Sequence, residues 1–175
     1  YLEHIKRLHQ LVSGRGKRMA MWADMFWHYP ELVSELPDDI LLLDWWYERK
    51  PSYDTVNVLK AAGREFYVCP ATSSWSTLFP RMENAISNIR DFTRAGVAAG
   101  ASGMVVTDWG DNGHFQPLSN SWHAYLTAAD AGWTGATTPM NEVDAAIGLL
   151  FLRDASGKQI AAIRRLGAAM QVAPD

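Results

Sequence analysis

Hydrophobic residues occur along the chain in four short continuous runs, and the stretches between these runs have apolar residues at helical spacing. The four runs are RMAMWAD (18–24), ILLLDWW (40–46), EFYVCP (65–70) and SGMVVTDW (102–109). Continuous apolar runs of this length predict buried strands. The spacing predicts amphipathic helices over residues 1–13, 53–62, 81–98 and 119–131. Strands that alternate with helices are typical of a parallel sheet covered by helices, so we predict an α/β fold.

Four strand–helix units form either half of a (β/α)8 TIM barrel or a small doubly wound sheet. Neither GxGxxG nor GxxxxGK[ST] follows any of the predicted strands. Glycine-rich loops of this kind bind the phosphates of nucleotides, and their absence weakens the doubly wound alternative. The half-barrel is therefore the favoured fold.

The C-terminal part of the chain has a different pattern. Residues 134–140 are rich in Gly, Thr and Ala, as in a linker. Beyond them, NEVDAAIGLLFL and KQIAAIRRLGAAM have the spacing of two helices. We expect a half-barrel over 1–133, a linker over 134–140 and a small helical tail over 141–175. The N-terminal YLEHIKRLHQL is amphipathic rather than a signal peptide, and we expect the chain to be a piece of a longer protein.

Composition and charge narrow the classes of function. The chain has 175 residues, of which 48% are hydrophobic and 20% charged, as in a folded globular protein. A net charge of −3 gives no reason to expect nucleic acid or an anionic membrane as a partner. The one cysteine, Cys69, excludes an internal disulfide framework; it fits a reducing cytoplasm and leaves secretion open.

Tryptophan and carboxylate side chains gather where the predicted strands end. The four strand ends carry Trp22 and Asp24; Asp44, Trp45 and Trp46; Ser73, Ser74 and Trp75; Asp108, Trp109, Asp111 and His114. The carboxyl ends of parallel strands form the active face of α/β proteins. Indole planes suit the apolar faces of a pyranose ring, and carboxylates accept hydrogen bonds from its hydroxyls. The pattern therefore predicts a carbohydrate site.

Other roles are open for several of these residues. Strand alternation allows only one of Trp45 and Trp46 to face the site. Asp44 lies either in the site or in a salt bridge inside the barrel. His114 either orients a carboxylate, acts as an acid or base, or caps the next helix. We expect the remaining tryptophans to pack in the core; these are Trp27, Trp122 and Trp133.

Metal-dependent and serine-nucleophile chemistry are not expected at these strand ends. The spacing of Asp24, Asp111 and His114 matches no tight metal-ligand motif. Ser73 and Ser74 lack the GxSxG context of a nucleophile elbow. We accordingly expect neither a metal site nor a cofactor.

The segments MWADMF, ILLLDWW, FYVCPATSSW and TDWGD resemble the second half of a glycoside hydrolase family 20 catalytic domain, the family of β-N-acetylhexosaminidases, over residues 1–133. In that family the last strand ends in Trp-x-Glu; here it is Trp109-Gly110-Asp111, with an acid one methylene shorter. The resemblance implies that Trp109 forms a wall around the N-acetyl group and that Asp111 binds sugar hydroxyls.

Further binding residues follow from the same resemblance. Trp22 and one of Trp45 or Trp46 would be further walls of the pocket. Secondary candidates are Asp24, Trp75 and His114. The family also has a tyrosine that bonds the acetamido oxygen. No equivalent is evident here, because Tyr67 lies within a strand and Trp75 occupies the expected loop.

The catalytic pair of the family is expected outside this chain. Family 20 enzymes use an adjacent Asp-Glu pair at the end of barrel strand four, and the acetamido oxygen of the substrate attacks the anomeric carbon, a substrate-assisted retaining route. If the four strands here are strands five to eight, that pair lies upstream of Tyr1. Asp38-Asp39 is no substitute, since it precedes its strand. The parent protein would then cleave terminal β-linked GlcNAc or GalNAc, with this chain supplying the sugar pocket.

Two other functions are compatible with the sequence. One is a different barrel glycosidase whose carboxylates are Asp24, Asp44, Asp108 or Asp111. The other is a non-catalytic sugar-binding or scaffolding module. A half-barrel has two unpaired edge strands, so we expect either the missing half of the barrel or self-association to cover them.

Overall fold

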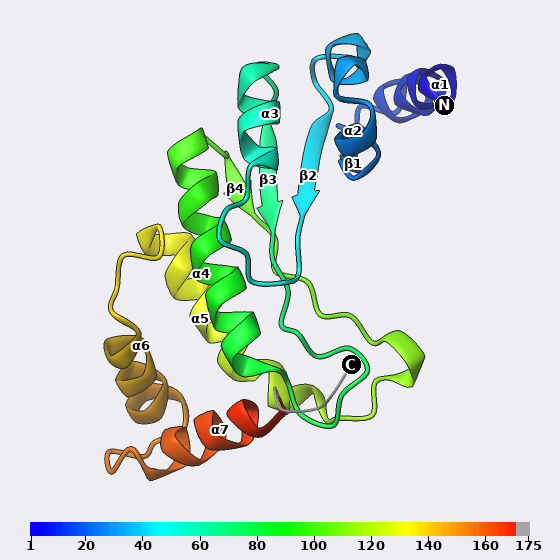
Figure 1. Ribbon diagram of the computed structural model, residues 1–175. Helices are drawn as coiled ribbons and strands as arrows, with labels where there is room; N and C mark the ends of the chain where they lie inside the picture. The colour runs from blue at the N-terminus through cyan, green and yellow to red at the C-terminus, as the bar shows by residue number, and fades with distance from the viewer. Residues whose placement is uncertain (171–175) are drawn as a thin grey trace. The chain divides into compact units, whose positions relative to one another are not determined.

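Four short strands form one parallel sheet in the order β1-β2-β3-β4 (Figure 1). The strands are β1 (Ala20–Trp22), β2 (Leu41–Trp45), β3 (Phe66–Cys69) and β4 (Gly103–Met104). Each lies inside one of the predicted apolar runs. The computed structural model describes residues 1–170, so the last five residues of the predicted 141–175 tail lie outside the described range. The predicted α/β class with a parallel sheet is confirmed.

Helices precede, separate and follow the strands. They are α1 (Leu2–Ser13), α2 (Met25–His28), α3 (Thr55–Ala61), α4 (Met82–Ala99), α5 (Trp122–Thr134), α6 (Met140–Ala146) and α7 (Lys158–Ala169). Short 3-10 turns cover Pro30–Glu35, Asp111–Gly113 and Leu118–Ser121, and a π-helical turn covers Ile147–Phe151. In the described part of the chain, no helix combines the length and the apolar character that crossing a membrane requires.

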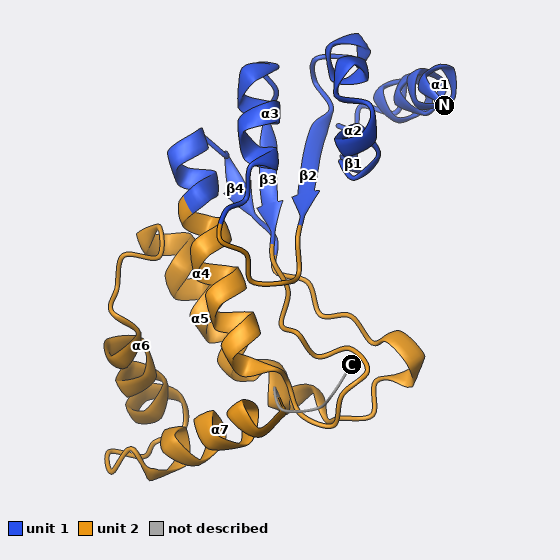
Figure 2. Cartoon of the chain, in the orientation of Figure 1, with its two compact units in different colours: residues 1–45, 52–69, 95–105 blue, residues 46–51, 70–94, 106–175 orange. Residues whose placement is uncertain are grey.

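The chain divides into two compact units (Figure 2). Unit 1 consists of residues 1–45, 52–69 and 95–105 and contains the whole sheet. Unit 2 consists of residues 46–51, 70–94 and 106–175 and contains the loops that follow β2, β3 and β4, together with α5, α6 and α7. Helix α4 contributes its first part to unit 2 and its last turn to unit 1.

The two faces of the sheet in unit 1 differ in burial. One face carries Leu42, Asp44, Phe66 and Val68, all of which are buried. Val68 packs against Gly96 of α4, where a β-carbon would lie 2.7 Å from a Val68 methyl group. Sequential order with right-handed crossovers puts the connecting helices on this one face. The opposite face carries Trp22, Leu43, Trp45 and Tyr67, and none of these four is fully buried.

Strand β4 is much shorter than the predicted run 102–109. Regular pairing with β3 ends at Val68 and Met104, two residues before Pro70, which has no N–H to donate to a ladder. In unit 2 the backbone N–H of Thr107 donates to the carbonyl of Pro70 at 2.9 Å, and Thr107 forms an isolated bridge with Ala71. The chain after Met104 is therefore loop backbone, which individual hydrogen bonds rather than a continuous ladder connect to the segment after β3.

The C-terminal helices of unit 2 are joined by charged side chains. His123 of α5 bonds Asp144 of α6 through its Nε2 at 2.7 Å, and Arg164 of α7 pairs with Glu83 of α4 at 2.9 Å. Between α5 and α6, Arg90 of α4 donates to the carbonyl oxygens of Ala136 and Thr138. Val143 of α6, Ile147 of the π-helical turn and Ile160 of α7 form a small buried apolar cluster.

Candidate functional site

Three aromatic rings from three loops meet in unit 2. The ring of Tyr47 lies 5.8 Å from that of Trp75, with an angle of 55° between their planes. It lies 6.1 Å from the ring of Trp109, with an angle of 50°. Trp109 is 38% exposed, and Tyr47 and Trp75 are partly buried. The residues Tyr47, Trp75 and Trp109, called the aromatic cluster below, thus form a partly open apolar wall.

The loop that carries Trp75 is tightly held. Residues 71–74 are fully buried, and Ser73 and Ser76 have left-handed backbone with φ of 57° and 50°. Gln116 donates its side-chain amide to the carbonyl of Ser74 at 2.7 Å, and Ser74 bonds the hydroxyl of Ser121 at 2.7 Å. Non-glycine residues adopt left-handed backbone only where their surroundings compensate for the strain, and such positions cluster at ligand sites.

Two asparagines of α4 hold the loops of the aromatic cluster. The side-chain amide of Asn84 donates to the carbonyl of Tyr47 at 2.7 Å and to the hydroxyl of Ser73 at 2.8 Å. Asn88, one turn further along α4, donates to the carbonyl of Trp46 at 2.7 Å and accepts from the N–H of Ala71 at 3.0 Å. The loops after β2 and β3 are therefore fixed to the same helix.

Asp108, next to Trp109, is a carboxylate that accepts hydrogen bonds on both oxygens. Its Oδ2 accepts from the hydroxyl of Tyr125 at 2.6 Å, and its Oδ1 accepts from Thr72 at 3.0 Å. The Nε2 of His114 lies 3.6 Å from Oδ1. Burial raises the pKa of Asp108, but hydrogen bonds from Tyr125, Ser121, Thr72 and Ser74 outweigh it and leave the pKa below its usual value. Asp108 is therefore ionised at neutral pH.

The turn after Trp109 folds back toward Asp108. Asp111–Gly113 is a 3-10 turn, and Asn112 and His114 have left-handed backbone with φ of 59° and 46°. A β-carbon at Gly110 would lie 3.0 Å from the Cβ of His114, so a larger residue at this position would require His114 to shift. Asp111 itself is exposed. His114 thus pairs with Asp108 rather than with Asp111.

The predicted site residues of unit 1 lie at or just after the ends of β1 and β2. The indole Nε1 of Trp45 donates to Asp24 at 3.2 Å. Trp22 and Trp45 lie on the same, less buried face of the sheet, because Trp22 is in register with Leu43, two residues before Trp45. Asp44 is fully buried and accepts from the hydroxyl of Thr55 at 2.7 Å.

Cations cover two of the tryptophans in unit 2. The Nζ of Lys50 lies 3.0 Å from the ring centre of Trp46, and the guanidinium of Arg81 lies 4.5 Å from that of Trp75. Cation–π contacts of this kind fix the orientation of an indole. Strand alternation does not decide between Trp45 and Trp46, since Trp45 ends β2 in unit 1 and Trp46 begins a loop segment of unit 2.

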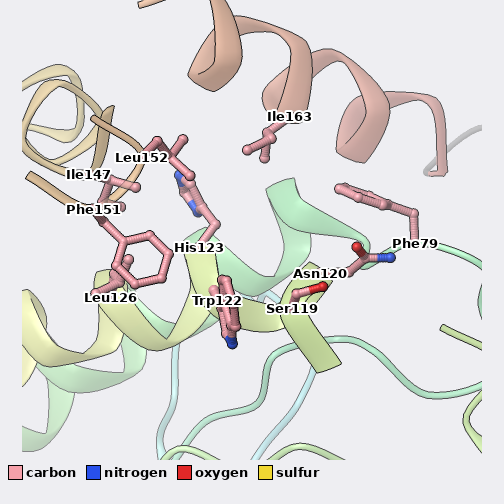
Figure 3. A pocket seen from close by; sticks show the side chains of 10 residues that line it. All are labelled: Phe79, Ser119, Asn120, Trp122, His123, Leu126, Ile147, Phe151, Leu152 and Ile163. Carbon is pink, nitrogen blue, oxygen red and sulfur yellow. The ribbon is translucent and has the colours of Figure 1, made fainter. Parts of the chain in front are cut away.

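The expectation that all three remaining tryptophans pack in the core is wrong for Trp133, which is 92% exposed at the end of α5, and for Trp122, which is also an exposed residue. Trp122 is 46% exposed, and its ring meets that of Phe151 edge-on at 5.2 Å. It lines a narrow crevice between α5 and the π-helical turn (Figure 3). The crevice holds about 70 Å³, room for roughly two waters and too little for a sugar ring. Trp27 is partly buried.

Sequence reasoning missed two residues of the candidate site, Tyr47 and Tyr125. It named Asp108 at a strand end and as a possible catalytic carboxylate, but not as a partner of Tyr125. Tyr47 directly follows Trp45-Trp46, so its position after a strand was the available signal. Tyr125 had no such signal, because it lies 17 residues from Asp108 on another element.

Within residues 1–170, no group of three His, Cys, Asp or Glu side chains is arranged to hold a metal ion. Comparison of the chain with models of protein families and with curated proteins found no match.

Proposed function

We propose that this chain supplies the sugar-binding pocket of a glycoside hydrolase that acts on terminal β-linked N-acetylhexosamine. The observation that carries the proposal is the aromatic cluster, in which the rings of Trp75 and Trp109 both contact the ring of Tyr47 beside the TDWGD segment. A pocket with several aromatic walls and a few fixed polar groups is the usual form of a small-ligand site. Asp111, exposed on the adjoining turn, would accept hydrogen bonds from sugar hydroxyls.

Tyr47 would fill the role of the tyrosine that binds the acetamido oxygen, for which the sequence offered no equivalent. Its ring lies 5.8 Å and 6.1 Å from the two indoles that would enclose an N-acetyl group. A phenol beside an apolar wall offers both an O–H donor and a ring face.

The order of the strands supports the half-barrel. A doubly wound sheet reverses its strand order at a switch point, whereas β1-β2-β3-β4 is sequential, as in a (β/α)8 barrel. All-parallel sheets are normally covered on both faces, and here one face carries partly exposed Trp22 and Trp45. In a barrel that face would point to the interior, with four further strands closing it.

Asp108 is a poor general acid, which supports a pocket without its own catalytic pair. A general acid at neutral pH needs a raised pKa, but that of Asp108 is lowered. Asp38 and Asp39 precede β2 and are bonded by Arg64 and His9 at 2.7 Å each. The Asp-Glu pair of a substrate-assisted retaining mechanism would therefore come from the other half of the barrel.

A titration with N-acetylglucosamine followed by tryptophan fluorescence tests the proposal. Trp109→Ala and Trp75→Ala should each weaken binding about tenfold or more, because each removes an aromatic wall. Trp133→Ala is the matched control and should leave the affinity unchanged, since Trp133 is 92% exposed and outside the aromatic cluster. Wild-type affinity in Trp109→Ala would contradict the proposal.

A non-catalytic sugar-binding module is the second candidate, favoured by the lowered pKa of Asp108. The two candidates differ in hydrolysis of a chromogenic N-acetylglucosaminide by the full-length protein. Turnover supports the hydrolase, and sugar binding without turnover supports the module. Enzyme-like turnover by residues 1–175 alone would contradict both, because each describes this chain as a binder without its acid.

A further inference from the structure

Asp108 joins three segments of unit 2 at one carboxylate. Thr72 comes from the loop after β3, Tyr125 comes from α5, and His114 ends the turn that follows Trp109. The Asp108 side chain is 10% exposed, and each of its oxygens accepts at least one hydroxyl. A carboxylate held on both oxygens has one orientation, and its backbone is fixed with it.

The turn from Trp109 to His114 begins and ends at Asp108. It starts at the next residue in the chain, and it returns through the His114 imidazole, 3.6 Å from Oδ1. Inside the turn, Asn112 and His114 have left-handed backbone, and the N–H of Gly113 donates to the carbonyl of Gly110 at 3.1 Å. Left-handed backbone is common for asparagine but unfavourable for histidine, so contacts of His114 outside the turn help to maintain this conformation.

Other groups near this contact do not replace it. Asp111, on the same turn, is exposed, and Tyr125 bonds the other oxygen of Asp108. Asn112 donates to the hydroxyl of Ser76 at 3.0 Å, an exposed contact between neutral groups. The His114 imidazole, with its Nε2 3.6 Å from Oδ1 of Asp108, is therefore the side chain that brings the end of the turn back to the Asp108 carboxylate.

We propose that Asp108 is a positioning residue that holds the turn 109–114, and with it Trp109 and Asp111, in the conformation that binds sugar. The proposal rests on the proposed function only for the identity of the ligand as a sugar. The ordering of the turn rests on the geometry alone. Asp108 itself is 10% exposed and need not touch the ligand.

Amide hydrogen exchange measured on the whole chain tests the proposal without any ligand. Asp108→Asn keeps the size of the side chain and removes its charge, and His114→Gln removes the imidazole while leaving Asp108 with Tyr125 and Thr72. Both variants should speed exchange at residues 110–114, above all at the bonded N–H of Gly113, by about tenfold or more. Exchange in α5 and α7 should stay as in wild type for His114→Gln.

Asp154→Asn is the matched control. Asp154, which precedes α7, is likewise a carboxylate that accepts hydrogen bonds on both oxygens, here from the backbone N–H groups of Ser156 and Gln159. Its pKa is lowered mainly by the N–H of Gln159. This variant should change exchange near residues 154–159 and leave 110–114 unaffected.

Fluorescence and affinity complete the experiment. The emission of Trp109, isolated by subtracting a Trp109→Phe spectrum, should become more accessible to acrylamide in His114→Gln, and N-acetylglucosamine affinity should fall about tenfold. Unchanged exchange at 110–114 in His114→Gln would overturn the proposal, as would exchange that rises equally throughout unit 2. If wild type binds no sugar while the turn loosens as expected, the proposed function fails and the positioning role of Asp108 stands.

Discussion

Asp108 and Trp109 are neighbours in the chain but take different parts in the site. Asp108 turns into the protein and binds Tyr125 and Thr72, whereas Trp109 is 38% exposed and faces Tyr47. The sequence indicated a carboxylate and an indole at this strand end. It did not indicate which carboxylate would be buried, because Asp111 is the one that matches the family pattern.

The ionisation of Asp108 predicts a stability difference that depends on pH. Its folded pKa is lower than its ordinary value, so its contribution is complete above the ordinary pKa and is lost as the pH falls through the lowered value. Asp108→Asn should reduce the free energy of unfolding by about 1–3 kcal/mol at pH 7. Urea unfolding at a series of pH values should show this difference shrinking in acid; a constant difference would contradict it.

Cys69 offers a second test at the residue scale. Burial raises the pKa of its thiol to about 12, with Asp44 adding to the effect, and its side chain is inaccessible. Since the thiolate is the reactive form, the native chain should react with iodoacetamide at pH 8 at least about a hundredfold more slowly than the chain in urea. Equal rates, measured by mass spectrometry, would show that the end of β3 is open.

At the scale of elements, α4 serves as the support for the loops of the site. Asn84 and Asn88 lie one turn apart on it and bond backbone groups of the segments that carry Tyr47 and Trp75. Helical periodicity predicted this helix over 81–98, close to its observed Met82–Ala99. The same periodicity assigns polar residues to the solvent, whereas Asn88 is fully buried.

Asn88→Ala should therefore destabilise unit 2. It leaves the N–H of Ala71 and the carbonyl of Trp46 without this partner in a buried setting, at a cost of about 3 kcal/mol. Ser87→Ala, the neighbouring change on α4, should cost less than about 0.5 kcal/mol. Thermal or urea unfolding measures both, and equal effects of the two substitutions would contradict a structural role for Asn88.

At the scale of the whole molecule, the sheet of unit 1 has helices on one face and partly exposed Trp22, Leu43, Trp45 and Tyr67 on the other. On the half-barrel proposal, this face and the edge strands β1 and β4 need a partner, either the other half of the barrel or a second copy.

Light scattering after size exclusion should accordingly give a mass above one chain for residues 1–175 purified alone. Trp22→Lys places a charge on the uncovered face and should reduce this association. Leu78→Lys is the control, because Leu78 is 73% exposed and lies in unit 2. A stable monomer at tens of micromolar, with no increase on concentration, would count against the half-barrel.

The sequence alone determined the elements and their class. Four apolar runs and the helices between them are local patterns, and a parallel α/β sheet follows from their alternation. It also placed tryptophans and carboxylates after the strands, because position relative to a strand end is a local property.

Only the tertiary structure decided which of these side chains meet. Tyr47 joins Trp75 and Trp109, and Tyr125 reaches Asp108, through loops whose course depends on α4 and on left-handed residues such as Ser73 and His114. Trp133, which was expected in the core, is exposed, since its burial also depends on which distant segments pack against it. A hydrophobic pattern reports how far each residue prefers to leave water, whereas contacts between distant segments depend on how the backbone closes between them.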